Sequence, residues 1–450
     1  MSEAAPTKGF AKSYESERVG PKWLRQTLVP VFLLSVCPPT AVVVWYTHTA
    51  LGGSLTELVA LFRQEGVLAA LARIWGPVFL GTRAAWEIIG AFAAVELALM
   101  RVLPGARFVG PVTANGNVPV YKANGVLAFL VTIALFCGAS FGLRLFPASI
   151  VYDNFGGILG AMNVFSVLFC LMLYLKGRFA PSSSDHGTSG NPIFDYYWGT
   201  ELYPRILGWD VKTFTNCRFG MMAWPLILLS FAARQSETVG LSDSMAVAVG
   251  LQLVYVAKFY WWETGYLRSL DIMHDRAGFY ICWGCLVWVP AIYTSSTLYL
   301  VGHPNHLGTP VAALLFVLGV ACIFTNYAAD AQRQRVRATD GKTTVWGKPP
   351  VIVVGHYTTE GGEKKESVLL ASGFWGISRH FHYVPEILGA LCWTLPALFG
   401  GVLPYFYVIF LTALLTDRAL RDDNRCAIKY GQDWKKYCAL VRYRILPGIL

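Results

Sequence analysis

The stretch GTPVAALLFVLGVACIFTNYAADAQRQRVR, residues 308–337, decides what class of protein this chain is. Residues 308–327 are almost all apolar, and about 20 consecutive apolar residues allow an α-helix to cross the hydrocarbon core of a bilayer. The stretch ends in Arg333, Arg335 and Arg337, a basic flank that is typical of the cytosolic end of a membrane span. It therefore predicts a transmembrane helix whose C-terminal end faces the cytosol.

Composition extends this interpretation to the whole chain. The protein has 450 residues, of which 55% are hydrophobic and 14% charged, and its mean hydropathy is +0.46. These values are too apolar for a soluble globular protein of this size. Further apolar runs lie at roughly 28–47, 76–101, 124–143, 155–175, 219–233, 244–262 and 278–300, and a double-length run at 384–416 breaks near FGGVLP.

The apolar runs predict helices, because the alternating ten-residue pattern of an outer-membrane barrel does not occur in them. We therefore predict an all-α fold, a polytopic membrane protein with about ten transmembrane helices. Residues 55–75 carry charges at intervals and predict a helix that lies on the membrane surface instead of crossing it.

The chain divides into three predicted regions. Residues 1–26 form a polar cytosolic segment with no signal peptide, residues 27–327 hold transmembrane helices 1–8, and residues 328–450 hold the last two with a cytosolic tail. Basic residues are frequent in the tail, as the positive-inside tendency requires of a cytosolic segment. With ten spans and a cytosolic N-terminus, the cytosolic side also holds the segments 177–218, 263–277 and 328–383.

Charge and cysteine content bear on the partners. The net charge of +10 is spread over the termini and polar loops with no long basic block interleaved with aromatic residues. No nucleic acid is therefore expected as a partner, and anionic lipid or an anionic cofactor suits the charge better. Most of the ten cysteines lie in or beside apolar runs and are interpreted as small buried hydrophobic residues. Cys282 and Cys285 form a C-x-x-C pair, but they lack the context of a redox domain.

Ionisable residues close to the apolar runs are candidates for function, because charge is costly near hydrocarbon. Arg83 and Glu87 are one helical turn apart and are interpreted as a structural ion pair. Glu263 and Asp271 lie in WWETGYLRSLDIMHDRAG, residues 261–278, at the mouth of two predicted spans. Burial there would raise the pKa of a carboxyl group and keep a proton available for donation. A solvated cytosolic turn explains the same spacing equally well.

His380 and His382 form an H-x-H pattern in SRHFHYVPE. Two histidines without a companion histidine box supply too few ligands for a di-iron site or a closed zinc site. No metal site is predicted for this chain.

Arg333 and Arg337 are four residues apart and would share one face of a helix beyond the span. Two guanidinium groups in this arrangement can grip a phosphate. A solvated basic flank is the simpler interpretation of these two residues alone. Neither a G-x-G-x-x-G after a strand nor a P-loop motif occurs, so any nucleotide is held outside a Rossmann or P-loop fold.

The charged stretch near the C-terminus is RALRDDNRCAIKYGQDWKKYCALVRYRILP, residues 418–447. Asp422, Cys426 and Tyr430 are four residues apart, so a helix would place them on one face. This face is either the wall of a polar pocket or the side of a helix on the membrane surface. As a wall it would enclose one phosphorylated cofactor, together with the two arginines and the aromatic loop around Trp375.

Four long blocks resemble one known family. They are FTNCRFGMMAW (214–224), DIMHDRAGFYICWGCLVWVPAIYTS (271–295), SGFWGISRHFHYVPEILGA (372–390) and RDDNRCAIKYGQDWKKYC (421–438). In this order they resemble the sterol reductase family of ten-span membrane proteins, and the resemblance extends from about residue 20 to the end of the chain. The blocks are most similar to the plant form of the branch that reduces a Δ7 double bond.

The resemblance implies an NADPH-dependent enzyme of the endoplasmic reticulum membrane that reduces the C7–C8 double bond of 5,7-diene sterols in sterol biosynthesis. Residues 27–327 would form the sterol-access half and residues 328–450 the NADPH-binding half. In animal forms a lysine replaces Arg333 and an asparagine replaces His382, and both keep a hydrogen-bond donor in place. The NADPH contacts of the family fall on Arg333, Arg337, Leu370, Trp375, His382, Tyr383, Asp422, Cys426, Ala427, Ile428, Lys429, Tyr430 and Tyr437.

The reaction that the resemblance implies needs a proton and a hydride. A 5,7-diene has no carbonyl group to polarise, so the expected route is proton donation to C8, which leaves an allyl cation over C5 to C7, followed by hydride transfer from NADPH to C7. Glu263 and Asp271 are the candidate proton donors, with Tyr266 behind them. The expected partners are a sterol that enters sideways from the bilayer, membrane lipids and other enzymes of the sterol pathway.

Two other functions compete with this interpretation. RHFHY followed by YGQDWKKY also resembles the cofactor-binding region of membrane methyltransferases of the isoprenylcysteine carboxyl type. About ten spans, and two arginines that would find no phosphate on S-adenosylmethionine, count against a methyltransferase. A non-catalytic sterol-binding or scaffold protein is the third interpretation.

Overall fold

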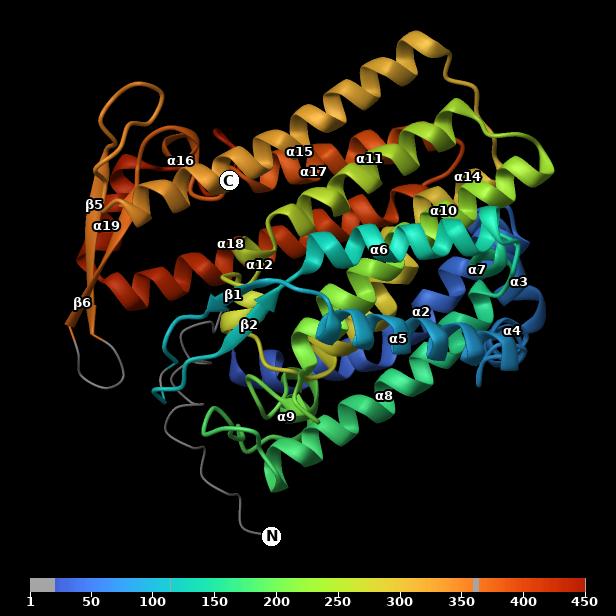
Figure 1. Cartoon of the computed structure of the whole chain (residues 1–450), viewed down its shortest axis with the longest axis horizontal. Helices are drawn as coiled ribbons and strands as arrows, with labels where there is room; N and C mark the ends of the chain where they lie inside the picture. The colour runs from blue at the N-terminus through green and yellow to red at the C-terminus, as the bar shows by residue number, and fades with distance from the viewer. Residues whose placement is uncertain (1–20, 114, 359–363, 450) are drawn as a thin grey trace.

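Helices make up most of the structure, a computed structural model that describes residues 21–113, 115–358 and 364–449. The longer helices lie side by side in one bundle, and a hairpin and short helices stand at one end of it (Figure 1). The α-helices are α2 (Val29–Ala50), α3 (Leu55–Glu65), α4 (Val67–Trp75), α5 (Arg83–Val102), α6 (Gly125–Cys137), α7 (Ile150–Asp153), α8 (Phe155–Phe179), α9 (Pro192–Trp198), α10 (Met221–Thr238), α11 (Asp243–Trp261), α12 (Glu263–Tyr266), α13 (Leu270–Met273), α14 (Ser295–Gly302), α15 (Thr309–Ala338), α16 (Phe374–Ile377), α17 (Tyr383–Thr394), α18 (Phe406–Tyr430) and α19 (Gln432–Leu440).

Wider and tighter helical turns extend several of these helices. Four segments are π-helical: η1 (Leu24–Leu28), η2 (Gly138–Gly142), η3 (Thr213–Gly220) and η4 (Phe279–Tyr293). Two are short 3-10 turns: η5 (Leu395–Ala397) and η6 (Leu403–Tyr405). FGGVLP, residues 399–404, follows η5, and its last two residues begin η6, so the predicted break in the double-length apolar run is confirmed.

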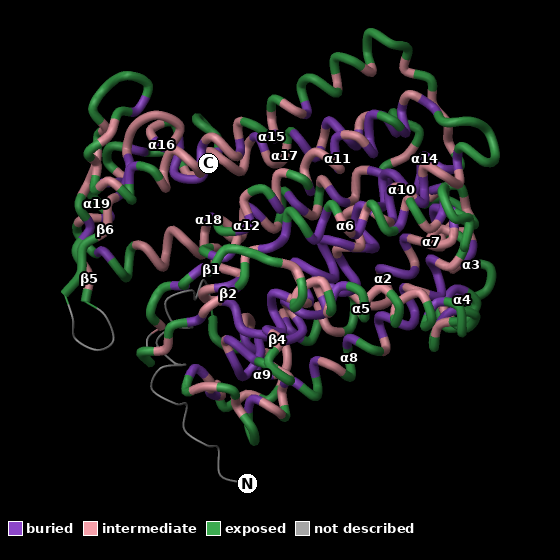
Figure 2. The backbone as a smooth tube through the Cα atoms, in the orientation of Figure 1, coloured by how far each residue is buried: buried purple, intermediate pink, exposed green. Residues whose placement is uncertain are grey.

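Within the described part of the chain, 7 helical segments are long and apolar enough to cross a membrane. Buried residues gather where these helices pack together, and exposed residues lie along the outer faces, as Figure 2 shows. The segments are Leu24–Ala50, Gly125–Gly142, Phe155–Phe179, Asp243–Trp261, Phe279–Gly302, Thr309–Ala338 and Leu403–Tyr430.

The predicted count of about ten spans is therefore not confirmed. Helix α5 overlaps most of the run 76–101, ends at Val102 and carries Arg83, Glu87, Glu96 and Arg101. Helix α10 has 18 residues and ends in the polar sequence ARQSET, and α17 has 12 residues. The surface helix predicted over 55–75 is divided into α3 and α4 at Gly66, where φ is +79°.

The all-α prediction needs one correction, because three short antiparallel hairpins are present. They are β1 (Ala106–Val109) with β2 (Val120–Ala123), β3 (Arg205–Ile206) with β4 (Trp209–Asp210), and β5 (Ile352–Thr358) with β6 (Lys364–Leu370). Helical periodicity could not reveal them, since β5 is rich in β-branched residues within a polar loop. All three hairpins lie outside the candidate spans, where water can satisfy their open edges.

The segments predicted to share the cytosolic side do gather at one end of the bundle (Figure 1). The segment 263–277 is joined to the tail by the ion pair between Asp271 Oδ1 and Arg418 Nη2, 2.7 Å apart. The segment 328–383 is joined to the tail by Arg379 Nη1, which donates to the Val441 carbonyl at 2.7 Å. These contacts bring segments 263–277 and 328–383 and the tail together around one region.

A fully buried ion pair holds the start of segment 263–277. Arg218 Nη2 in η3 lies 2.6 Å from Glu263 Oε1, and both side chains are almost entirely buried. Arg218 Nη2 also donates to Asn124 Oδ1 at 2.7 Å, and the Gly125 amide donates to Glu263 Oε2 at 2.8 Å. The pair therefore connects η3, α12 and the first turn of α6.

We expect Glu263→Gln to lower the free energy of unfolding by about 3–5 kcal/mol, because it leaves the Arg218 charge buried without its partner. Thermal unfolding of the protein in detergent measures the change. The matched control is Glu87→Gln, since Arg83 Nε and Glu87 Oε1 form the predicted surface pair at 2.8 Å with side chains that are 93% and 62% exposed. The control should cost less than about 1 kcal/mol, and an equal effect of the two substitutions would contradict this account.

Candidate active site

One large cavity lies between α11, α15, α17, α18, segment 263–277 and the β5–β6 hairpin. Its volume is about 1690 Å³, which exceeds the roughly 300–1,000 Å³ of a site for one drug-sized ligand. The cavity therefore has room for more than one small molecule.

One end of the cavity is basic. Arg333 Nη2 lies 2.8 Å from Asp330 Oδ1, and the Arg333 guanidinium carbon lies 3.9 Å from the ring centroid of Trp375. Arg337 Nε donates to the Val368 carbonyl at 3.2 Å. Both arginines line the cavity, so the predicted sharing of one helical face is confirmed.

The tail forms the wall opposite these arginines. Helix α18 continues without a break from the last span to Tyr430, which puts Asp422, Cys426 and Tyr430 on the cavity side. Asp422 Oδ1 accepts from Arg425 Nη2 at 2.6 Å. Burial raises the pKa of Tyr437 on α19. The tail is thus packed into the protein, and the alternative of a helix on the membrane surface does not describe this segment.

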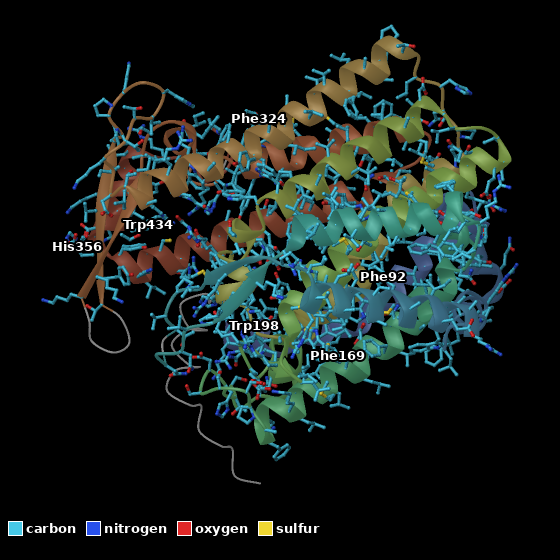
Figure 3. All side chains as sticks on the ribbon, viewed as in Figure 1. Phe92, Phe169, Trp198, Phe324, His356 and Trp434 are labelled. Carbon is cyan, nitrogen blue, oxygen red and sulfur yellow. The ribbon has the colours of Figure 1, made fainter. Side chains whose placement is uncertain are left out.

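The hairpin closes this wall from outside. His356 and Trp434 lie at this end of the molecule (Figure 3). His356 Nδ1 lies 2.8 Å from Asp433 Oδ2, and the His356 amide donates to the same oxygen at 3.1 Å. These bonds fasten β5 to α19, while Lys429 Nζ lies 3.9 Å from the ring centroid of Tyr357.

Two histidines, His380 and His382, pack in the wall of the cavity. The ring of His382 lies 5.0 Å from Trp375 and 4.3 Å from Tyr383, measured between centroids. Its carbonyl accepts from Asn326 Nδ2 at 3.0 Å. Burial lowers the pKa of His382 to about 3 and that of His380 to about 4. Both rings are therefore neutral at pH 7.

The other end of the cavity is aromatic. Phe259, Trp262 and Tyr266 line it, and the rings of Phe259 and Tyr266 are 5.0 Å apart. Burial raises the pKa of Tyr266 far above its usual value. Its hydroxyl is buried and has no hydrogen-bond partner among the described residues.

The three candidate proton donors are placed differently. Tyr266 lines the cavity, whereas Glu263 and Asp271 do not. Glu263 lies behind the wall in its ion pair with Arg218, and Asp271 is paired with Arg418.

The structure brings most of the predicted cofactor contacts together. Every one of them lines the cavity except Ala427, which is a neighbour of lining residues on α18. Residues that the sequence interpretation missed line the same cavity, among them Tyr255, Lys258, Asn326 and Glu386. Lys258 and Glu386 lie within predicted apolar runs, and that position was the signal that could have identified them.

Known proteins resemble this chain over most of its length. The sequence profile of the ergosterol biosynthesis ERG4/ERG24 family matches residues 54–450. The chain is 54% identical to a 7-dehydrocholesterol reductase of Arabidopsis thaliana over 93% of this chain and 96% of that protein. It is 37% identical to a 7-dehydrocholesterol reductase of Xenopus laevis over 85% of this chain and 84% of that protein. A Delta(14)-sterol reductase of Methylotuvimicrobium alcaliphilum is 36% identical over 93% of both chains.

The buried neutral histidines predict a loss of stability in acid. The unfolded chain binds a proton at each histidine below pH about 6.5, whereas folded His380 does so only near its pKa of about 4. Between these values the unfolded state holds more protons, so stability falls as pH falls, by up to about 1.4 kcal/mol per pH unit for each such histidine. Thermal unfolding from pH 7.5 to 5 should show a smaller decrease for His380→Asn than for the wild type.

His306→Asn is the control for this measurement, because His306 is exposed. The control should follow the wild-type curve. An identical acid decrease in the wild type and His380→Asn would contradict a buried neutral His380.

Proposed function

This chain belongs to the ergosterol biosynthesis ERG4/ERG24 family, and from that membership we propose that it is a multi-pass enzyme of the endoplasmic reticulum membrane that uses NADPH to reduce the C7–C8 double bond of 5,7-diene sterols. One cavity with a basic end and an aromatic end carries the proposal. A phosphorylated dinucleotide needs charged and polar surroundings, whereas a flat apolar ring system needs apolar ones. Hydride transfer requires the two sites to adjoin. The name of the Arabidopsis thaliana relative supports the Δ7 position.

The basic end fits NADPH. Arg333 and Arg337 are oriented by neighbouring groups and present cationic N–H donors suited to the 2′-phosphate. Arg333 Nε and His382 Nδ1 are buried without a hydrogen-bond partner among the described residues, which suits polar atoms that await a ligand. Asp422 offers acceptor oxygens for a ribose hydroxyl or an amide. When bound, NADPH supplies the hydride for C7.

Tyr266 is the residue to which we assign the proton. Its raised pKa keeps the phenol protonated at neutral pH, and it lies at the aromatic end, where the sterol rings fit. Donation breaks the O–H bond, forms a C8–H bond, and leaves an allyl cation on the sterol and a phenolate that solvent protonates again. The positive charge of Arg418 acts in the direction that favours this phenolate.

Glu263 and Asp271 support Tyr266 in this proposal. Each carboxylate forms an ion pair with an arginine and does not line the cavity, so neither is placed to reach the sterol. Their positions on either side of Tyr266 in the chain suit a role in holding the phenol in place.

The surroundings of the enzyme follow from its membrane helices. The sterol comes from the bilayer, membrane lipids surround the helices, and association with other sterol-pathway enzymes belongs to the same proposal. The decisive assay is purified protein with NADPH and 7-dehydrocholesterol, in which the ultraviolet absorbance of the diene should disappear. A methyltransferase or a non-catalytic sterol-binding protein would leave the absorbance unchanged, and turnover of only an 8,14-diene would move the chain to Δ14 reduction.

The cofactor assignment predicts that Arg333→Ala with Arg337→Ala weakens NADPH binding far more than NADH binding. Two charge-assisted bonds to the 2′-phosphate would contribute roughly 1.5–3 kcal/mol each. Binding titrations with both cofactors measure the difference. Equal losses for NADPH and NADH would mean that these arginines do not bind that phosphate.

The proton assignment predicts that Tyr266→Phe lowers turnover by about a hundredfold to ten-thousandfold, because the ring remains but cannot donate a proton. NADPH affinity should stay at the wild-type value. Tyr357→Phe is the matched control, since Tyr357 lines the cavity at the hairpin end and its loss of a hydroxyl should leave turnover near normal. Wild-type turnover of Tyr266→Phe would exclude Tyr266 as the donor.

A further inference from the structure

A second polar cluster, formed by α11, α15 and α17, lies in the wall of the cavity. Tyr255 Oη on α11 donates to Glu386 Oε1 on α17 at 2.6 Å, across 131 positions of sequence. Lys258 Nζ donates to Asn326 Oδ1 at 2.8 Å and lies 5.0 Å from the ring centroid of Tyr255. All four residues line the cavity.

A purely structural role for this cluster would be energetically costly because of where its residues lie. Tyr255, Lys258 and Asn326 lie within helices that are long and apolar enough to span the membrane. Ionisable groups at such positions are costly and commonly mark substrate or ion sites. The phosphate-binding arginines and the tail already supply the polar partners of a dinucleotide, so the cluster serves a different ligand.

We propose that Glu386 and Tyr255 form the subsite for the 3β-hydroxyl group of the sterol, an inference that rests on the proposed function. A 5,7-diene sterol of this type carries one polar group, and a hydroxyl both donates and accepts a hydrogen bond. Glu386 is half-buried, and Tyr255 is the donor to its carboxylate among the described residues. The second carboxylate oxygen can accept from the sterol hydroxyl, which would be costly to bury unpaired.

The spacing along α17 fits the shape of the substrate. Glu386 is three residues beyond Tyr383, a rise of about 4.5 Å along the helix. Tyr383 packs on His382, and both line the cavity. In a sterol, the hydroxyl-bearing C3 and the reacting C7 and C8 are separated by the fused A and B rings, a comparable length. Phe259 and Trp262 also line the cavity and are suited to pack beside the rings.

This arrangement fixes the direction in which the sterol binds. Ring A points to this polar cluster, and the side chain at ring D points away from Glu386. The enzyme would therefore be strict about the 3-hydroxyl group and tolerant of changes in the side chain.

The test compares 7-dehydrocholesterol with its 3-deoxy analogue, cholesta-5,7-diene, in the full-length enzyme. We expect the wild type to reduce the hydroxylated sterol with a kcat/KM at least about tenfold higher, because a site built for a hydroxyl rejects a ligand that lacks it. Glu386→Met and Tyr255→Phe should lower kcat/KM for 7-dehydrocholesterol by a similar factor and leave the 3-deoxy substrate unchanged. The ratio of kcat/KM for 7-dehydrocholesterol to kcat/KM for the 3-deoxy analogue would then fall toward one.

The controls separate folding and cofactor binding from recognition of the hydroxyl. Tyr299→Phe removes the hydroxyl of a buried tyrosine on α14 that does not line the cavity, and it should keep the wild-type preference. NADPH affinity of Glu386→Met should equal that of the wild type. A wild type that reduces both sterols equally, or variants that lose both substrates in proportion while Tyr255→Phe remains folded, would overturn the subsite. A wild type inactive on both sterols would instead overturn the proposed function.

Discussion

The buried ion pair between Arg218 and Glu263 is the interaction on which the site depends. It joins three parts of the chain, because Arg218 also binds Asn124 and Glu263 also accepts from the Gly125 amide. Breaking such a pair is costly, since the remaining charge stays buried. A second pair, Asp271 with Arg418, holds the other end of the same segment against the tail helix. Tyr266 lies between these two attachments, so its ring is held at the cavity from both sides.

In α11, α15 and α18 the apolar length packs in the bundle, and the last turns supply polar groups to the cavity. In α17 the first turn supplies Tyr383 and Glu386. In α15 the apolar part ends and the next turns supply Asp330, Arg333 and Arg337. In α18 the same helix continues from the last span to Tyr430 without a break. This continuity explains why an apolar chain ends in a charged tail. The membrane-spanning part of α18 positions the end of the helix, and that end needs polar residues because it forms a wall of the cavity.

The cavity combines surroundings that a single ligand would not require. Cationic and acidic groups at one end suit a phosphorylated dinucleotide, whereas Phe259, Trp262 and Tyr266 suit flat apolar rings. Neutral His380 and His382 also line this cavity, and their burial keeps them from adding charge there. A hydride acceptor and a hydride donor would meet within this one cavity.

Local periodicity determined much of this protein. The apolar runs predicted membrane helices, the break at FGGVLP was placed correctly, and the spacing of Arg333 with Arg337 and of Asp422 with Cys426 and Tyr430 predicted shared faces, because an α-helix brings residues four apart together. The β5–β6 hairpin, the withdrawal of Glu263 and Asp271 into ion pairs, and the meeting of Tyr255 with Glu386 were decided only by tertiary structure. Periodicity describes which side of one helix a residue occupies, whereas the partner across the interface depends on how separate helices pack.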